Sequence, residues 1–290
     1  MKRLLSQLIL ILILLTVSAS AEKGDTISIL LLGTDNIGEV SITDSEEMSR
    51  ADAIFIVTIQ PNTQSIKLMS IERDYLVELP DNYGVNKLGT SSYFGGPQLA
   101  MKTINQFFQL DVSQYAHIDI ENIIKAIDIM GGIDINVYEG EVDEVNSFIE
   151  GILAYEGLSK VKAGINHING PEAWAFLGVR NNDTDAIDSN ADRNDRQQRV
   201  FKACIEKVFN MDVSEIIQLI SDLIPLIDTN LSMADILNLM NAALASDLDQ
   251  IAYFRTPNTP YEMKRVDMHR GLIVKDMQKE IDGIHSFLYD

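Results

Sequence analysis

The chain has 290 residues, of which 46% are apolar and 23% are charged. This balance is typical of a folded globular protein and excludes a disordered one. The net charge is −20 at pH 7, because 43 acidic residues outnumber 23 basic ones. A chain this acidic repels the phosphates of nucleic acids, which excludes a non-specific nucleic-acid binder. The single cysteine, Cys204, excludes an internal disulfide and a cysteine-based zinc site, and its apolar helical surroundings predict a small buried side chain.

The N-terminal segment has the layout of an export signal. Residues 1–3 are basic at two positions, residues 4–17 are almost wholly apolar, and Ala19 and Ala21 are small residues at the −3 and −1 positions of a signal-peptidase site. The apolar run of about 14 residues is shorter than the ~20 that span a bilayer. A cleaved signal peptide over residues 1–21 and a retained N-terminal membrane anchor both remain open. Either one predicts an extracytoplasmic protein, secreted or held at the outer face of the cytoplasmic membrane.

From residue 22 onward, apolar runs of strand length alternate with segments of helical spacing. Pro61 and Asn62 lie between two strand-like runs and predict a β-hairpin. Gly131 predicts the end of a helix, and Pro171 predicts the start of another. The polar, acidic stretch 181–195 is interpreted as a loop. The expected strands are 27–33, 53–59, 65–71, 115–120, 133–137 and 251–255, and the expected helices are 99–108, 121–130, 171–180, 193–209, 213–227, 233–245 and 273–288.

These elements predict the fold class. Strands and helices alternate without an internal repeat, and no Pro- or Ser-rich linker divides the chain. We therefore expect a single α/β domain over residues 22–290, with a mixed central β-sheet and helices on both of its faces.

Basic residues stand out in a chain this acidic, and several of them flank expected strands. Arg193, Arg196 and Gln197 share one face of an expected helix, in its first turn. Arginine is unfavourable there because the helix N-terminus is already positive, unless an anion lies between the side chains. The alternative is that the arginines pair with acidic neighbours such as Asp192 and Asp195. The other basic candidates are Arg50, Arg73, Lys87 and Arg180.

Two carboxylates have positions suited to a metal ion. Asp35 directly follows the first expected strand, and Asp52 lies at the start of the second. Carboxylates at strand ends near an arginine cluster fit a Mg²⁺ that bridges the protein and phosphate oxygens. The alternative is that each is an ordinary loop or capping residue.

The order of these motifs resembles the LytR-CpsA-Psr (LCP) family, whose domain is also called the cell envelope-related transcriptional attenuator domain. The resemblance runs from about residue 27 to 211, which leaves residues 212–290 as a C-terminal extension. No single motif is decisive, but eight in the right order are specific. They are Leu-Leu-Gly-Thr-Asp35, Arg50-x-Asp52, Ser-Ile-x-Arg73-Asp74, Lys87 before Gly95-Gly96-Pro97, Tyr115 to Asp119, Gly131-Gly132-Ile-Asp-Ile-Asn-Val137, Asn169-Gly170-x-Glu172-Ala173 and Arg193-x-x-Arg196-Gln197-Gln198.

The resemblance implies an activity. LCP proteins are extracytoplasmic phosphotransferases of mainly Gram-positive bacteria, which move an anionic glycopolymer such as teichoic acid or capsule from polyprenyl pyrophosphate to a muramic-acid hydroxyl of peptidoglycan. The lipid is expected in an apolar tunnel of the fold, with the pyrophosphate at its rim. Carried over by motif, Asp35 and Asp52 correspond to the magnesium ligands. Arg50, Arg73, Lys87, Arg180, Arg193 and Gln197 correspond to the pyrophosphate-binding residues, and Arg73, Asp74 and Arg193 to the catalytic ones.

Some positions depart from the family pattern. The usual Arg-x-Arg is Gly178-Val-Arg180 here, so one arginine is missing. Glu72 replaces a proline beside Arg73 and is expected to add negative charge at an anion site. Gly89 stands where the pattern has asparagine. These departures keep a second hypothesis open, a binding-only relative that holds polyprenyl phosphate or an envelope polymer. A third is a hydrolase of the same lipid that releases phosphate without an acceptor.

Overall fold

The computed structural model describes residues 26–34, 50–60, 63, 65–152, 155–179, 186–244, 251–266 and 268–290, with backbone alone at 186–194, 209, 213 and 240–244. Its centre is a six-stranded mixed sheet with the strand order β10-β3-β2-β1-β6-β9. Strands β1, β2 and β3 pair antiparallel, whereas β6 pairs parallel with β1 and β10 pairs parallel with β3. The bounds are β1 Ile27–Thr34, β2 Ala51–Gln60, β3 Ser65–Ile71, β6 Gln114–Asp119, β9 Asp228–Thr229 and β10 Ala252–Thr256.

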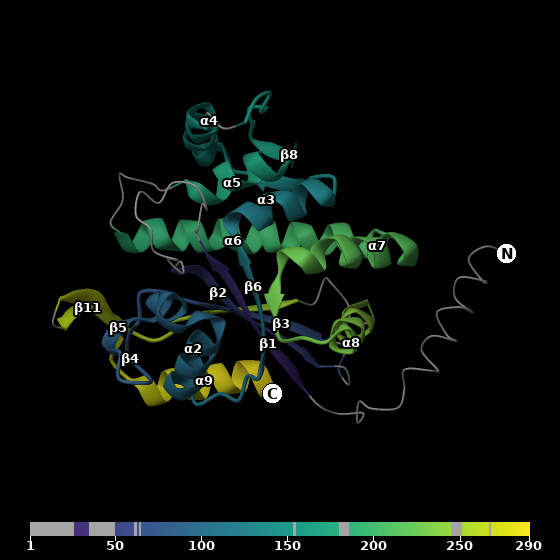
Figure 1. Cartoon of the computed structure of the whole chain (residues 1–290). Helices are drawn as coiled ribbons and strands as arrows, with labels where there is room; N and C mark the ends of the chain where they lie inside the picture. Colours follow the sequence, from purple (N-terminus) through teal and green to yellow (C-terminus); the bar gives the residue numbers. More distant parts are fainter. Residues whose placement is uncertain are drawn as a thin grey trace.

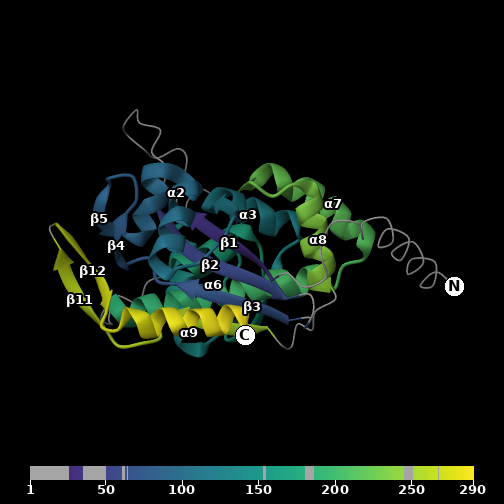
Figure 2. The ribbon, with the colours of Figure 1, turned by 90° about the horizontal axis from the view of Figure 1, so that it is seen from below.

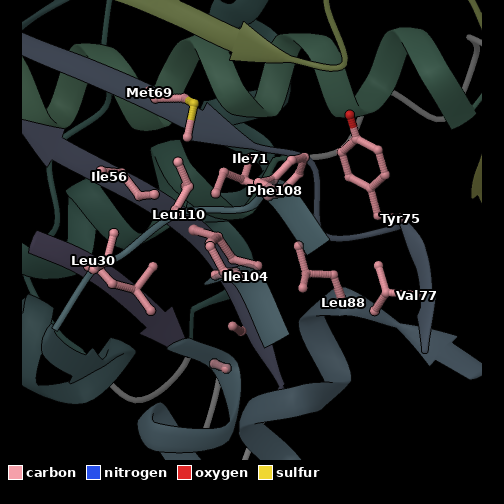
Figure 3. Packing of buried hydrophobic residues seen from close by; sticks show 14 of the residues in the cluster. Leu30, Ile56, Met69, Ile71, Tyr75, Val77, Leu88, Ile104, Phe108 and Leu110 are labelled. Carbon is pink, nitrogen blue, oxygen red and sulfur yellow. The ribbon is translucent and has the colours of Figure 1, made fainter. Parts of the chain in front are cut away.

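One face of this sheet packs against α2 (Ser91–Phe108) and α9 (Met277–Tyr289), which lie below the sheet in Figure 1. Alternate side chains of the central strands point into this layer, including Leu30, Ile56 and Met69, none of which is exposed. Figure 3 shows them meeting Ile104 and other residues of α2 and of the strand ends. Burial of this continuous apolar layer is the main force that fixes α2 and α9 on the sheet.

The opposite face is crossed by the long helix α6 (Ala186–Phe209), with α7 (Val213–Leu223) beside it and a further layer beyond (Figure 1). That layer surrounds a second hydrophobic cluster, separate from the first. It consists of α3 Ile120–Ile129, β7 Ile133–Val137, α4 Val142–Gly151, β8 Gly164–Ile168 and α5 Gly170–Gly178, with β7 and β8 antiparallel; α8 (Met233–Leu244) contacts β2.

Two small hairpins complete the molecule at one end of the sheet (Figure 2). The first is formed by β4 (Leu76–Leu79) and β5 (Gly84–Lys87), and the second by β11 (Tyr261–Val266) and β12 (His269–Val274). The remaining elements are the short 3-10 helices at 88–90, 139–141 and 224–226. Within the described ranges, no helix is long and apolar enough to cross a membrane.

The predicted fold class is confirmed, since the mixed sheet has helices on both faces. Two local interpretations were wrong. The stretch 186–195 is helical and not a loop, because it contains neither proline nor glycine to stop the helix that continues through it. The chain at 273–274 is the end of β12 and not the start of a helix, which begins only at Met277.

Candidate functional site

Five chain segments meet at one end of the central sheet. Strand β1 ends at Thr34, which pairs with Ala51 at the start of β2. The backbone N–H of Ala51 donates to Ser92 Oγ in the first turn of α2 at 2.8 Å. Gly89 N–H donates to the carbonyl of Arg73, just after β3, at 2.9 Å. A Cβ at Gly89 would lie 2.7 Å from the carbonyl oxygen of Ala51, so this close approach requires glycine.

Two ion pairs lie at this meeting point. Arg73 pairs with the carboxylate of Asp52 at the start of β2. The next residue, Asp74, accepts a hydrogen bond from Lys87 Nζ through Oδ1 at 2.7 Å. The Arg73 and Lys87 side chains are 25% and 38% exposed, so each cation contacts solvent as well as its carboxylate. Arg50 is exposed at the start of β2. The structure thus brings Arg50, Asp52, Arg73, Asp74 and Lys87 to one end of the sheet.

The negative charge that Glu72 was expected to add at this site is balanced by a cation from another strand. The Glu72 carboxylate is buried and pairs with Arg255 of β10, with Arg255 Nη2 and Glu72 Oε2 3.1 Å apart. The backbone N–H of Glu72 also donates to the carbonyl of Thr256 at 3.1 Å. Sequence reasoning missed Arg255, because nothing in its local pattern indicates which strand β10 joins.

Helix α6 carries the Arg193 motif, but the motif is not in the first turn. The helix begins at Ala186, so Arg193 lies about two turns inside it. Backbone N–H groups there bond within the helix and are not offered to an anion. The argument for an anion held at a helix N-terminus is therefore wrong. Gln197 is half-buried on the same helix.

Arg196 is a structural residue and not an exposed cation. Its side chain is only 2% exposed, and Nη2 donates to the carbonyl of Val179 at 2.6 Å. Its Nη1 lies 3.4 Å from Glu141 Oε1. Val179 is the C-terminal capping residue of α5, so Arg196 fixes the backbone at the end of that helix.

Arg199, which the sequence did not single out, binds the same carboxylate. It donates to both oxygens of Glu141, at 3.0 and 2.5 Å, and its guanidinium lies between the rings of Tyr138 and Phe176. Burial raises the pKa of Glu141, but the hydrogen bond and charge of Arg199, with the Tyr138 N–H and the Arg196 charge, lower it further, and the net shift is downward. These contacts attach α6 to the layer formed by β7 and α5.

Position 178, where the family pattern has an arginine, is a glycine with an aromatic ring packed against it. A Cβ at Gly178 would lie 2.7 Å from Phe148 Cζ, so the phenyl ring fills the space beside this position. Phe148 also packs edge-to-face on Trp174, with ring centroids 5.9 Å apart. A larger side chain at 178 would have to displace this aromatic pair.

Three of the predicted site residues lie wholly or partly outside the described residues. They are Asp35, Arg180 and the side chain of Arg193. Among the residues whose side chains the structure describes, no group of three or more His, Cys, Asp or Glu could hold a metal ion. The carboxylate of Asp52 is the one predicted magnesium ligand within that part of the chain.

The sheet face toward α6 is buried differently from the face toward α2. Leu31 and Val57 of the two middle strands β1 and β2 are only half-buried, although side chains at such positions normally form the core. Phe55 stacks on Phe201 of α6 with ring centroids 6.2 Å apart. Tyr253 of the edge strand β10 is 40% exposed. The apolar side chains at the centre of this face, Leu31, Phe55 and Val57, therefore belong to neither of the two hydrophobic clusters.

The fold and the site define a class: an α/β protein with a mixed sheet whose end gathers cationic side chains and carboxylates, an arrangement suited to a phosphate-bearing ligand. The family model described as the LytR_cpsA_psr family matches residues 12–282. The chain belongs to this family, and the match extends beyond the 27–211 covered by the sequence motifs.

Known proteins agree with this assignment. The chain is 28% identical over 190 residues to the polyisoprenyl-teichoic acid–peptidoglycan teichoic acid transferase TagU of Bacillus mycoides. The aligned residues make up 66% of this chain and 55% of that protein. The alignment thus spans about half the length of that relative. A crystal structure of protein gbs0355 from Streptococcus agalactiae matches with a TM-score of 0.74, 23% identity and coverage of 91% and 88% of the two chains. TagT with bound octaprenyl pyrophosphate lipid matches with a TM-score of 0.67, 19% identity and coverage of 93% and 94%.

Proposed function

We propose that this chain is an extracytoplasmic phosphotransferase that moves an anionic glycopolymer of the teichoic acid or capsule type from a polyprenyl pyrophosphate carrier to peptidoglycan. The observation that carries the proposal is the adjacent pair of cations, Arg73 and Lys87, held by Asp52 and Asp74 where the strands end. Each cation is held in place by its carboxylate and still contacts solvent. A relative, TagU, is named as a transferase of this kind.

The chemistry requires a group that holds and neutralises phosphate oxygens. An acceptor hydroxyl attacks the phosphorus next to the glycopolymer, a new P–O bond forms, and the bond from that phosphorus to the bridging oxygen breaks, which releases polyprenyl phosphate. Such a step depends mainly on positioning and on charge stabilisation. Arg73, Lys87 and Arg50 of the described site, with Arg180, Arg193 and Gln197, would bind the pyrophosphate. Asp74 or Asp52 would accept the hydroxyl proton.

The proposal includes a magnesium ion at this site. Mg²⁺ in phosphate sites typically uses one or two carboxylates and fills its other positions with phosphate oxygens and water. Asp52 supplies such a carboxylate, and Asp35 would supply the second, since the chain leaves β1 at Thr34 beside the start of β2. When bound, the ion would neutralise charge on the pyrophosphate.

The lipid is proposed to lie along the sheet face that α6 crosses. The half-buried apolar side chains there include Leu31, Val57 and Phe201, and a polyprenyl chain would complete their burial. TagT, which shares the fold, was crystallised with octaprenyl pyrophosphate. The N-terminal segment is proposed to keep the protein outside the cytoplasmic membrane, cleaved or retained as an anchor.

A second candidate is a binding-only relative. Phe148 fills the space beside Gly178, where the family pattern has an arginine, so one cation is replaced by an aromatic side chain. If that arginine stabilised the transition state, its loss would cost about 2–4 kcal/mol, as for one oxyanion donor. A carrier lipid would still bind, but transfer would be slow or absent.

The test measures two quantities on the same protein: binding of octaprenyl pyrophosphate with and without Mg²⁺, and transfer of labelled glycopolymer onto peptidoglycan. Arg73→Ala and Arg193→Ala are the test variants. Lys102→Gln is the matched control, because Lys102 forms only an exposed ion pair with Asp81. Loss of one of these pyrophosphate-binding arginines is expected to lower the transfer rate about 10²- to 10³-fold.

Each outcome discriminates between the candidates. Mg²⁺-dependent binding and transfer, both lost in the arginine variants and kept in the control, would support the transferase. Binding without transfer would support the binding-only relative. Binding that is absent, or indifferent to both arginines, would refute both. Phosphate release without an acceptor would identify a hydrolase.

A further inference from the structure

The hairpin formed by β11 and β12 carries three basic residues and two acidic ones, Glu262 and Asp267, in a chain whose acidic residues outnumber its basic ones about two to one. Lys264, Arg265 and Arg270 are all exposed on it, and its turn exposes 84% of Met268. Figure 2 shows the hairpin at one end of the molecule, beside β4 and β5. The whole chain carries a net charge of −20, so exposed cations concentrated on one small element call for an explanation.

Two of these cations lie directly opposite each other. Arg265 and Arg270 are partners in the antiparallel register, on the hairpin face that Met263 and Leu272 share. Like charges at directly opposed positions destabilise a strand pair. Neither guanidinium forms a hydrogen bond or ion pair with any residue that the structure describes. Lys264, on the other face, does pair with Glu262, at 2.6 Å.

The hairpin is attached to the proposed site. The N–H of Leu272 donates to the carbonyl of Asp74 at 2.8 Å, and Tyr75 and Leu272 form a parallel bridge. Gly271, the residue after Arg270, approaches so closely that a Cβ there would lie 2.4 Å from the same carbonyl oxygen. Arg270 is thus two residues before Leu272, which directly contacts the segment that carries Arg73 and Asp74.

We propose that Arg265 and Arg270 bind a phosphodiester group of an anionic polymer, as a site separate from the pyrophosphate-binding residues. This inference rests on the proposed function, because the donor there is a glycopolymer that repeats its negative charges beyond the pyrophosphate. A guanidinium offers a planar fork of donors that matches phosphate oxygens. An anion between the two arginines would also relieve their mutual repulsion.

A phosphate-bearing polymer is favoured over an anionic lipid surface. Arg270 lies on β12, the strand that contacts Asp74, and Arg265 is its partner on β11, so a ligand of the two arginines would lie near a donor bound at Arg73. The acidic body of the protein repels a polyanion, and a local cation pair is needed to hold it. A membrane surface remains as an outcome of the test.

The experiment uses the full chain and three probes: a glycerol phosphate oligomer, octaprenyl pyrophosphate, and vesicles that contain an anionic phospholipid. The variants are Arg265→Gln, Arg270→Gln and the double substitution. Lys264→Gln is the control, because it removes the same charge from the other face of the same hairpin. Urea unfolding of each variant is measured in parallel.

We expect each arginine variant to bind the oligomer about threefold more weakly, and the double variant about tenfold. Lys264→Gln should bind it as the unchanged protein does, and binding of octaprenyl pyrophosphate should be unchanged in all variants. The single arginine variants should unfold at a higher urea concentration, because a like-charge pair has been removed. If the arginines had a purely structural role, replacing them would lower the urea concentration at the unfolding midpoint.

Equal loss in Lys264→Gln would overturn the inference, since it would reflect net charge alone. No loss of oligomer binding, a lower urea midpoint, or loss confined to vesicle binding would overturn it as well. The proposed function fails separately: if the unchanged protein does not bind octaprenyl pyrophosphate, that proposal is refuted whatever the hairpin variants show.

Discussion

Replacing Glu141 by glutamine removes the one carboxylate that pairs with both Arg196 and Arg199. Arg199 donates two hydrogen bonds to it, and Arg196, only 2% exposed, lies 3.4 Å from Oε1. Breaking a buried ion pair from one side costs about 3–5 kcal/mol, because the remaining charge stays buried. Glu141 is 14% exposed, the amide oxygen still accepts one hydrogen bond, and Arg199 keeps its ion pair with Asp195 at 2.8 Å, so we expect Glu141→Gln to lower the free energy of unfolding by about 1–3 kcal/mol.

Urea unfolding at pH 7 measures this loss. Glu150→Gln is the control, because Glu150 pairs with Lys160 at the surface, where both side chains are more than half exposed. Its expected effect is below about 1 kcal/mol. A Glu141→Gln protein within about 0.5 kcal/mol of the unchanged one would refute the idea that this carboxylate holds α6 in place.

The ion pairs of Glu141 also predict that the stability of the protein depends on pH. The pKa of Glu141 in the folded protein lies below its ordinary value of 4.5. A carboxylate with a lowered folded pKa contributes stability above its unfolded pKa and loses it as the pH falls through the folded value. The stability difference between the unchanged protein and Glu141→Gln should be full at pH 7 and should shrink below about pH 4.5. A difference that stays constant down to pH 3 would contradict this reasoning.

Three further predictions concern other parts of the molecule. Gly271→Ala should lower stability by about 1–3 kcal/mol, since its Cβ would lie 2.4 Å from the Asp74 carbonyl oxygen, whereas Gly151→Ala, with no atom within 4 Å, should cost nothing; equal urea midpoints would contradict this. Glu280→Gln should lose about 2–4 kcal/mol in thermal or urea unfolding. This buried carboxylate accepts four hydrogen bonds from the last residue of β10 and the turn that follows, and an amide cannot accept them all; an unchanged midpoint would argue against it. Cys204 is half-buried, and desolvation raises the pKa of its thiol to about 12, so at pH 8 a disulfide reagent should label it much more slowly than a free thiol; a rate typical of a free thiol would contradict this.

Local sequence signals predicted much of the fold. Pro61 and Asn62 predicted a hairpin, and β2 and β3 on either side of them pair antiparallel from Gln60 and Ser65 onward. Gly131 ends α3 with a positive φ of 73°, a conformation that favours glycine. Helix α6 was misread at its start because an acidic, polar stretch resembles a loop. The contacts of Arg196 and Arg199 that stabilise this helix come from residues distant in sequence.

The sequence predicted which residues form the candidate site better than it predicted which of them pair with each other. Residues at strand ends such as Asp52, Arg73 and Lys87 were expected to gather, and the structure brings them to one end of the sheet. Their partners depend on how the strands are ordered. Glu72 was expected to add negative charge at the site, yet it pairs with Arg255, which is 183 positions away in the sequence.

The sequence by itself determined the periodicity of the strands and helices, the class of fold, and the family motifs that place the chain among LCP proteins. These features follow from local patterns, because each element buries one face according to its own spacing of apolar residues. Only the tertiary structure decided that Phe148 fills the place beside Gly178, that Glu72 pairs with Arg255, and that Arg265 and Arg270 lie opposite each other on the hairpin that contacts Asp74. Those contacts join distant segments, and the order in which strands and helices pack is fixed by burial of the whole chain.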